Sequence, residues 1–229
     1  MDTFTARSTW AELDAATGGL SKPGKMPGHA WSIPASRCNV GGKLREAGMA
    51  RNLPTVCRDC YALKGRYSWS STVNAQERRL EAYNADPGLW GEAMVASIIK
   101  VGDRAFRFFD SGDLQSSAML GHIAAVASAL PSVRFWLPTR ERGHVAHYLR
   151  DNELPENLNI RLSAALIGQE LAPANTGMLA GITVSTVRAK GARARGTEHR
   201  CPAPRQDGQC GSCRACWNPR VAVVSYGAH

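Results

Sequence analysis

The chain has 229 residues, 44% of them hydrophobic, and a formal net charge of +9 at pH 7. This length and hydrophobic content suit one domain with a sizeable core. No apolar run approaches the roughly 20 residues of a membrane span, and the polar residues 1–25 do not resemble a signal peptide. We therefore expect a cytoplasmic protein with no membrane partner, whose positive charge suits nucleic acid or a nucleotide.

Along the chain, short apolar segments alternate with amphipathic patterns. Six segments rich in β-branched or aromatic residues predict strands, and four patterns between them predict helices. The strand segments are residues 31–35, 105–109, 133–137, 159–162, 181–185 and 220–224, and the helix segments are residues 71–84, 89–99, 119–130 and 145–149. This order predicts an α/β fold with a parallel sheet or barrel. Residues 1–25 form a polar extension, and residues 26–229 form a single domain in which 190–217 are a cysteine-rich insertion.

Seven cysteines fall into two groups, the first of which is Cys38, Cys57 and Cys60. An odd number of clustered cysteines in a reducing compartment favours metal over disulfides. Three thiolates predict a [4Fe–4S] cluster with one iron open to a substrate or cofactor. The alternatives are a zinc site completed by a residue such as His29, or cysteines that are simply buried.

The second group is Cys201, Cys210, Cys213 and Cys216. Consecutive C-x-x-C-x-x-C spacing with a distant cysteine before Pro202 is close to ferredoxin ligation. We expect a second [4Fe–4S] cluster with all irons ligated. A structural zinc ion is the alternative, because four cysteines satisfy either metal.

Polar residues follow several predicted strands, where parallel sheets carry their chemistry. Asp110 and Asp113 are the candidate catalytic residues, as acid, base or partners of a cofactor amine. Alternatively, residues 111–116 only turn the chain and cap the next helix, and Arg140 belongs to a solvated surface. The candidate cofactor-binding residues are Tyr61, Ser111, Gly112, Asp113, Arg140 and Ser163.

Separated motifs carry a resemblance to a known family. They are residues 25–28, residues 31–35 with Cys38, Cys57 with residues 60–67, residues 106–113, and the four-cysteine tail that ends in Cys216 and Trp217. Together they resemble the phage family called gene product 88. The resemblance implies expression in an infected bacterial host, and it brings no activity with it.

The chain is more distantly similar to radical S-adenosylmethionine enzymes. Those have a cysteine loop after the first strand, an aromatic residue beside the last cysteine, as Tyr61 is, and a glycine–acid motif after the second strand, as residues 111–113 are. The likeness implies a partial (β/α)6 barrel, S-adenosylmethionine on the open iron, an external electron donor, and an auxiliary cluster in the tail. Those enzymes usually space their cysteines as C-x3-C-x2-C, whereas 18 residues separate Cys38 from Cys57.

Two other functions fit parts of the sequence. Residues 110–112 are similar to the D-S-G loop of barrel transglycosylases that exchange guanine for deazaguanine bases in nucleic acid and carry a structural zinc site. The first cysteine group has no role there. Without catalysis, the chain is a metal-braced nucleic-acid-binding module, with residues 190–200 as a basic loop that contacts phosphates.

Overall fold

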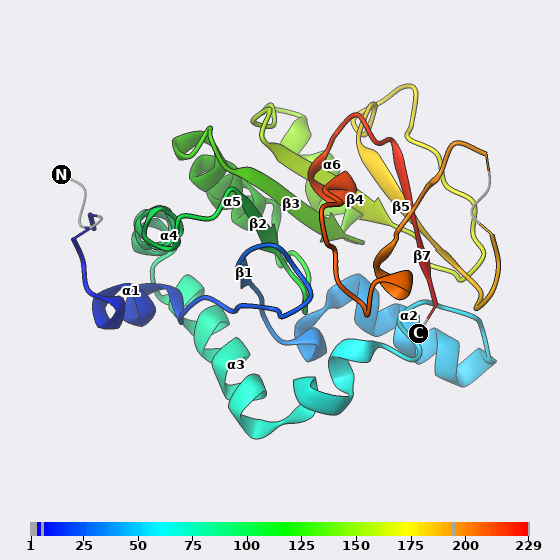
Figure 1. Ribbon diagram of the computed structural model, residues 1–229, viewed down its shortest axis with the longest axis horizontal. Coiled ribbons are helices and arrows are strands. Elements are labelled where there is room, and N and C mark those ends of the chain that lie inside the picture. Colours follow the sequence, from blue (N-terminus) through cyan, green and yellow to red (C-terminus); the bar gives the residue numbers. More distant parts are fainter. Residues whose placement is uncertain (1–3, 6, 194–195, 229) are drawn as a thin grey trace.

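A parallel sheet forms the centre of the molecule (Figure 1). The computed structural model describes residues 4–5, 7–193 and 196–228. The strands are β1 (Ala30–Trp31), β2 (Ala105–Phe108), β3 (Arg134–Thr139), β4 (Leu158–Ser163), β5 (Thr183–Arg188), β6 (His199–Arg200) and β7 (Val223–Gly227). Within the described residues they make one seven-stranded sheet, in the order β1-β2-β3-β4-β5-β7-β6, with every pair parallel. The sheet is open, with β1 and β6 at its edges.

Helices connect most of the strands. They are α1 (Trp10–Thr17), α2 (Asn39–Arg51), α3 (Ser70–Ala85), α4 (Pro87–Val101), α5 (Ser117–Ala129) and α6 (Arg142–Leu149). Short 3₁₀ helices are η1 (Ala35–Arg37), η2 (Tyr61–Leu63), η3 (Gly65–Ser68), η4 (Ala203–Arg205) and η5 (Ala215–Trp217). The predicted mixed α/β class and parallel sheet are confirmed, whereas β6, α1 and α2 were not predicted. No helix in the described residues has the length and hydropathy needed to cross a bilayer.

The two faces of the sheet are covered by different layers. Alternate strand residues face opposite sides, so that Phe106, Phe108 and Phe135 pack with α3, α4, α5 and α6 in the main core. Ala105 and Trp136 alternate with these residues along the strands and face the other side of the sheet. There they form a second apolar cluster with η5, which includes the buried Cys216. In Figure 1 this orange-to-red segment crosses the strands. The four-cysteine tail therefore occupies the face of the sheet that the helices leave free.

The N-terminal extension contains a helix that packs onto the rest of the fold. A capping box between Thr9 and Glu12 starts α1, which contacts α3 and α4. The Trp31 indole N–H donates a 2.8 Å hydrogen bond to the Thr17 carbonyl, so α1 is tied to β1. Gly18 ends the helix with φ 72°, where a Cβ would lie 2.4 Å from the Cα of Arg79. Only glycine fits this crossing.

Candidate metal centres

The first cysteine group converges beside the N-terminus of α2. Cys38 precedes this helix, and Cys57 and Cys60 lie in one turn, in which the Cys60 N–H donates to the Cys57 carbonyl at 3.3 Å. A Cβ placed on Gly41 would lie 3.6 Å from the sulfurs of both Cys38 and Cys57. These two sulfurs are therefore separated by no more than twice that distance. The fold therefore brings Cys38 and Cys57 together although 18 residues separate them in the sequence.

Electrostatic coupling shows that the third thiol belongs to the same group. Burial raises the pKa of Cys38, and the charges of Asp113, Cys60 and Cys57 raise it further. Burial also raises the pKa of Cys57, while Arg140 lowers the pKa of both thiols. Because metals bind thiolates, binding here must displace protons, and Arg140 favours that step.

A buried glutamate joins this group to the sheet. The Glu141 carboxylate, just after β3, accepts a 2.8 Å hydrogen bond from the backbone N–H of Val40 in the first turn of α2. It satisfies one of the free N–H groups there and places negative charge at the positive end of the helix. The cysteine that precedes α2 is thereby held at the carboxyl edge of the sheet.

Asp113 is bonded entirely by protein donors. One carboxylate oxygen accepts from the Thr139 hydroxyl at 2.5 Å and from the Leu114 N–H at 2.8 Å, and the other accepts from the Arg140 N–H at 2.9 Å. Desolvation raises the pKa of this carboxyl group to about 6, against those hydrogen bonds. The structure therefore places Asp113 as a joint between the loops that follow β2 and β3.

Asp110 is held by hydroxyl groups. One carboxylate oxygen accepts from the Ser32 hydroxyl, and the other accepts from the Tyr67 hydroxyl at 2.8 Å. Tyr61, beside the third cysteine, donates to the Asp110 backbone oxygen at 2.6 Å. Burial, and then the charge of Asp110, raise the pKa of Tyr67. Both tyrosines come from the cysteine loop, so this loop is fastened to the end of β2.

Ser111, between the two aspartates, carries a hydroxyl group without a protein partner. The side chain is buried, and its oxygen has no hydrogen-bond partner among the described residues. The backbone around it is fixed, because Gly112 has φ 78° and a Cβ there would lie 2.3 Å from the Ile33 side chain. Phe109 also has a positive φ of 59°, a strain of order 1–3 kcal/mol in a non-glycine residue. Such strain is common where the surrounding structure holds a functional loop.

The remaining predicted cofactor residues lie along the same edge. The Arg140 guanidinium donates to the Ala164 carbonyl at 3.2 Å, just beyond β4. Ser163 ends β4, where its hydroxyl accepts from Ser185 of β5 at 3.3 Å. The edge thus links the cysteine loop, the loop after β2 and the loop after β3.

The second cysteine group lies against the face of the sheet that carries Ala105 and Trp136. Cys201 follows β6, and its N–H donates to Ser225 of β7 at 2.9 Å. Cys210 and Cys213 share a turn with a 3.0 Å backbone hydrogen bond, and Cys216 is buried in η5. The Cys201 charge raises the pKa of Cys210 and that of Cys216, after burial in each case, so these thiols are neighbours.

Two hydrogen bonds distinguish the thiols of this group. The Cys216 sulfur lies 3.0 Å from the Tyr226 hydroxyl. The Cys213 sulfur lies 3.4 Å from Nε2 of His199. Burial raises the pKa of Cys216 to about 11, while its bond to Tyr226 lowers it. Cys216 is therefore the thiol held inside, and Cys213 is the thiol paired with a histidine.

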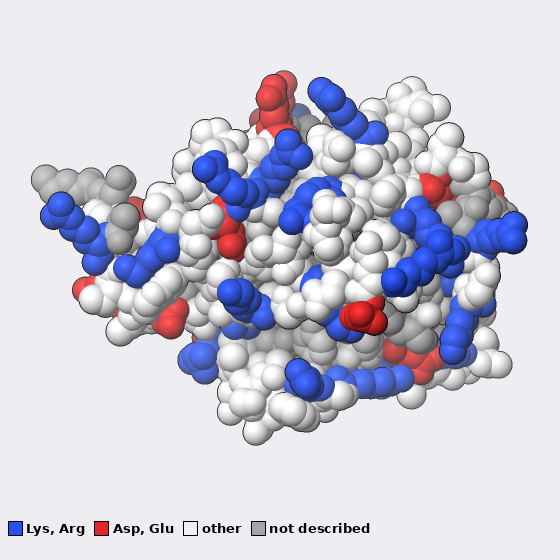
Figure 2. Space-filling view, viewed as in Figure 1, with Lys and Arg blue, Asp and Glu red and all other residues white. Residues whose placement is uncertain are grey.

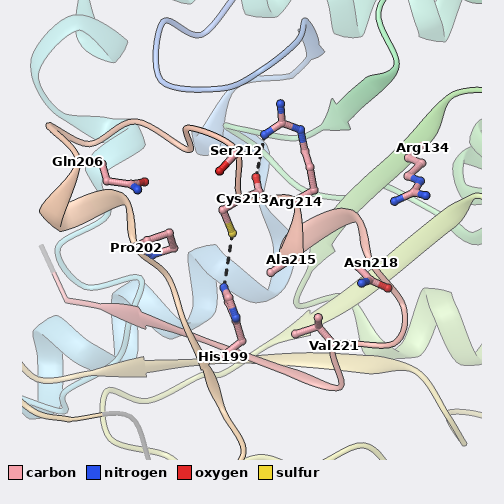
Figure 3. A pocket seen from close by; sticks show the side chains of 10 residues that line it. All are labelled: Arg134, His199, Pro202, Gln206, Ser212, Cys213, Arg214, Ala215, Asn218 and Val221. Carbon is pink, nitrogen blue, oxygen red and sulfur yellow. Dashed lines mark hydrogen bonds between the residues drawn. The ribbon is translucent and has the colours of Figure 1, made fainter.

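Cys213 and His199 line a surface pocket of about 410 Å³. Figure 3 shows the two side chains pointing toward each other. Arg134, Arg214 and Ser212 also line it. Of the four tail cysteines, Cys213 is the one that lines this pocket.

A cation lies between the two groups. The Arg107 guanidinium packs over the Trp136 ring, 4.3 Å from its centroid, and donates to the Phe109 carbonyl at 3.0 Å. Its charge lowers the pKa of Cys210 and Cys216 in the tail. The charges of Tyr61 and Asp110, beside the first group, favour its protonated form against desolvation. Arg107 is thus coupled by its charge to the thiols of the tail and to residues beside the first group.

Both groups lie within a segment that matches a known family, since residues 11–219 match gene product 88. The chain belongs to the gene product 88 family. No curated protein and no solved structure matches it. The functional inference for this gene product 88 protein therefore rests on its own side chains.

In this gene product 88 protein the cysteine sulfurs within each group are neighbours, but they do not surround a single metal position. No three His, Cys, Asp or Glu side chains in the described part of the chain are placed to hold one metal ion as they stand. Sequence analysis missed His199, Tyr67, Glu141 and Arg107. His199 is two residues before Cys201, which is a local signal, whereas the other three depend on contacts between distant segments. Residues 194 and 195 of the predicted basic loop lie outside the described residues.

Proposed function

We propose that this chain is an iron–sulfur enzyme in which Cys38, Cys57 and Cys60 hold a [4Fe–4S] cluster whose open iron takes S-adenosylmethionine. The convergence of Cys38 and Cys57 on Gly41 at the edge of a parallel sheet carries the proposal. A cubane binds each cysteine through a different iron, so it suits sulfurs that are spaced apart. Bound there, it supplies one-electron chemistry and a chelation site. On this proposal the open sheet is a partial barrel of the radical S-adenosylmethionine type.

Ser111 and Arg140 are the residues we assign to the methionine end of the ligand. The Ser111 hydroxyl, in the loop between Asp110 and Asp113, is buried with no partner among the described residues, and a polar ligand would satisfy it. Arg140 lies close enough to lower the pKa of Cys38 and Cys57, so it favours thiolates and a ligand carboxylate alike. Asp113 and Asp110, whose oxygens are engaged by protein donors, position the loop between them.

The tail supplies a second metal centre on this proposal, and an external donor supplies electrons. Figure 2 shows Lys and Arg spread over one whole face, with far fewer Asp and Glu. A surface of this charge favours an anionic substrate, either nucleic acid or a nucleotide, because attraction to phosphate needs no shaped site.

The test is reconstitution with iron and sulfide without oxygen, followed by titration with S-adenosylmethionine. We expect about four irons per chain at the first group, lost in Cys57→Ser and kept in Cys213→Ser. S-adenosylmethionine should change the electron paramagnetic resonance spectrum of the reduced cluster. Zinc without sulfide in Cys213→Ser, or an unaltered spectrum at millimolar ligand, would overturn the proposal.

The transglycosylase hypothesis predicts a separate outcome of the same experiments. Asp110, with hydroxyl donors on both oxygens, would then be the residue that acts on the base. Asp110→Asn would abolish base exchange on DNA or RNA in protein that contains no iron. Base exchange by iron-free protein would therefore favour that function over ours.

A further inference from the structure

His199 and Cys213 are in direct contact in the tail. Their Nε2 and Sγ atoms are 3.4 Å apart. Two ligands of one tetrahedral zinc ion, with Zn–S near 2.3 Å and Zn–N near 2.0 Å, are about 3.5 Å apart. The pair is therefore already spaced as two ligands of a single ion, whereas a cubane would put each ligand on a different iron.

Cys216 differs from the other cysteines of the tail. It is 9% exposed, and its sulfur is engaged with the Tyr226 hydroxyl at 3.0 Å. The pocket in Figure 3 is lined by Cys213 and His199 and lies on the side of the tail that faces solvent. An ion that enters there meets the Cys213–His199 pair first.

Cys201 and Cys210 are the cysteines that complete the set. The charge of Cys213 raises the pKa of each of them, after burial, so all three thiols share one neighbourhood. Hydrogen bonds to Ser225 and Lys25 fix the backbone of Cys201 and of Cys210. Their side chains have to close on the pair for an ion to be held.

We propose that the tail is a mononuclear zinc site whose ligands are Cys201, Cys210, Cys213 and His199, and that Cys216 stays off the metal as a thiol bonded to Tyr226. The proposal deepens the second metal centre proposed above and is independent of the cluster at the first group. Zinc at such a site adds folding free energy to the tail.

The test uses the full chain with Cys57→Ser in every sample, so that the first group does not bind. Zinc-edge X-ray absorption of the zinc-loaded protein should show three sulfurs and one nitrogen. His199→Ala should weaken zinc binding, measured against a competing chelator, by at least about tenfold, as lost partners at zinc sites do. His147→Ala removes an exposed histidine on α6 and should change nothing.

Cobalt gives a second measurement for Cys216. Sulfur-to-cobalt charge-transfer absorption rises with the number of bound thiolates, and it should be the same in Cys216→Ser and in Tyr226→Phe as in the parent. Four sulfur ligands in the zinc X-ray absorption spectrum would overturn the proposal. A cobalt charge-transfer band that weakens in Cys216→Ser, together with normal zinc binding by His199→Ala, would overturn it as well. Iron with sulfide held by the tail in the Cys57→Ser chain would overturn it too. That result would leave the proposed cluster at the first group unaffected, because the Cys57→Ser chain does not test it.

Discussion

Thr139 donates a 2.5 Å hydrogen bond to the carboxylate of Asp113, and this bond ties the end of β3 to the loop that follows β2. The backbone N–H of Arg140 strengthens the joint from the other oxygen at 2.9 Å. Asp113 is 4% exposed, and desolvation raises the pKa of its carboxyl group from 3.8 to about 6. A structural joint at the edge of the site therefore contains a group that titrates near neutral pH.

Asp113→Asn should change how stability depends on pH. Because the pKa of Asp113 is higher in the folded chain, its contribution is fully present below pH 3.8 and is lost as the pH rises through about 6. From about pH 4 to about pH 7, wild type should lose about 2–3 kcal/mol of unfolding free energy that Asp113→Asn does not lose. Urea unfolding across this range measures the difference. Asp151→Asn, which removes an exposed carboxylate, is the control, and parallel curves for Asp113→Asn and wild type would contradict the assignment.

Gly41→Ala and Gly42→Ala form a matched pair on α2. Gly42→Ala should add up to about 1 kcal/mol of helix stability, whereas in Gly41→Ala a tight contact with Cys38 opposes that gain. A methyl on Gly41 would lie 3.0 Å from the Cys38 Cβ and 3.6 Å from two sulfurs, whereas one on Gly42 would meet nothing within 4 Å. Iron and sulfide per chain after reconstitution should therefore fall in Gly41→Ala and stay normal in Gly42→Ala. Equal iron in the two variants would place the cluster elsewhere.

Ser111→Ala and Ser97→Ala remove buried hydroxyl groups that have no partner among the described residues. Both should leave the unfolding free energy unchanged or raise it by about 1 kcal/mol, because an unsatisfied polar group is lost. Ser111→Ala alone should weaken S-adenosylmethionine binding, by about threefold to tenfold, the value of one neutral hydrogen bond. Calorimetric titration of the reconstituted protein measures this. Identical affinities in the two variants would remove Ser111 from the ligand site.

Arg161→Met should detach the tail from the sheet. The fully buried Arg161 guanidinium donates to the carbonyl oxygens of Val184, Ala215 and Val221 at 2.8, 3.1 and 3.0 Å. Ala215 keeps a second donor, the Asn218 N–H at 3.2 Å. Each oxygen left without a donor costs about 1–3 kcal/mol, so urea unfolding should show a loss of at least about 2 kcal/mol. Limited proteolysis should then cut within residues 201–217. Arg214→Met, in the same tail, loses bonds at the surface and should change stability by less than about 1 kcal/mol.

The sequence predicts the strands of the sheet better than it predicts α2. β2, β3 and β4 carry aromatic or aliphatic residues at alternate positions, and most residues of these strands are buried because both faces of the sheet are covered. α2 contains Gly41, Gly42 and Gly48, which weaken the helical pattern. Gly48 is required because a Cβ there would lie 2.4 Å from the Thr55 hydroxyl oxygen. Two of the three glycines that weaken this helical pattern, Gly41 and Gly48, therefore let the cysteine loop pack on the helix.

Sequence analysis placed Asp110 and Asp113 at the correct edge of the sheet but could not find their partners. Thr139 lies 26 residues from Asp113, and Tyr67 and Ser32 lie 43 and 78 residues from Asp110. No local spacing encodes such contacts, since strand order and register create them. The expectation that these carboxylates face a ligand remains a prediction, while their role as joints between loops is a property of the fold.

The hydrogen bond from Trp217 to the carbonyl of Phe106 spans 111 residues of sequence. A ribosome that adds about 5–20 residues per second needs roughly 5 to 20 s to make that stretch. During this time β2 has left the ribosome, and the face that bears Ala105 and Trp136 has no cover from η5. The nascent chain therefore passes through a stage with an apolar sheet face in water, and a chaperone or rapid arrival of the tail must protect it from aggregation.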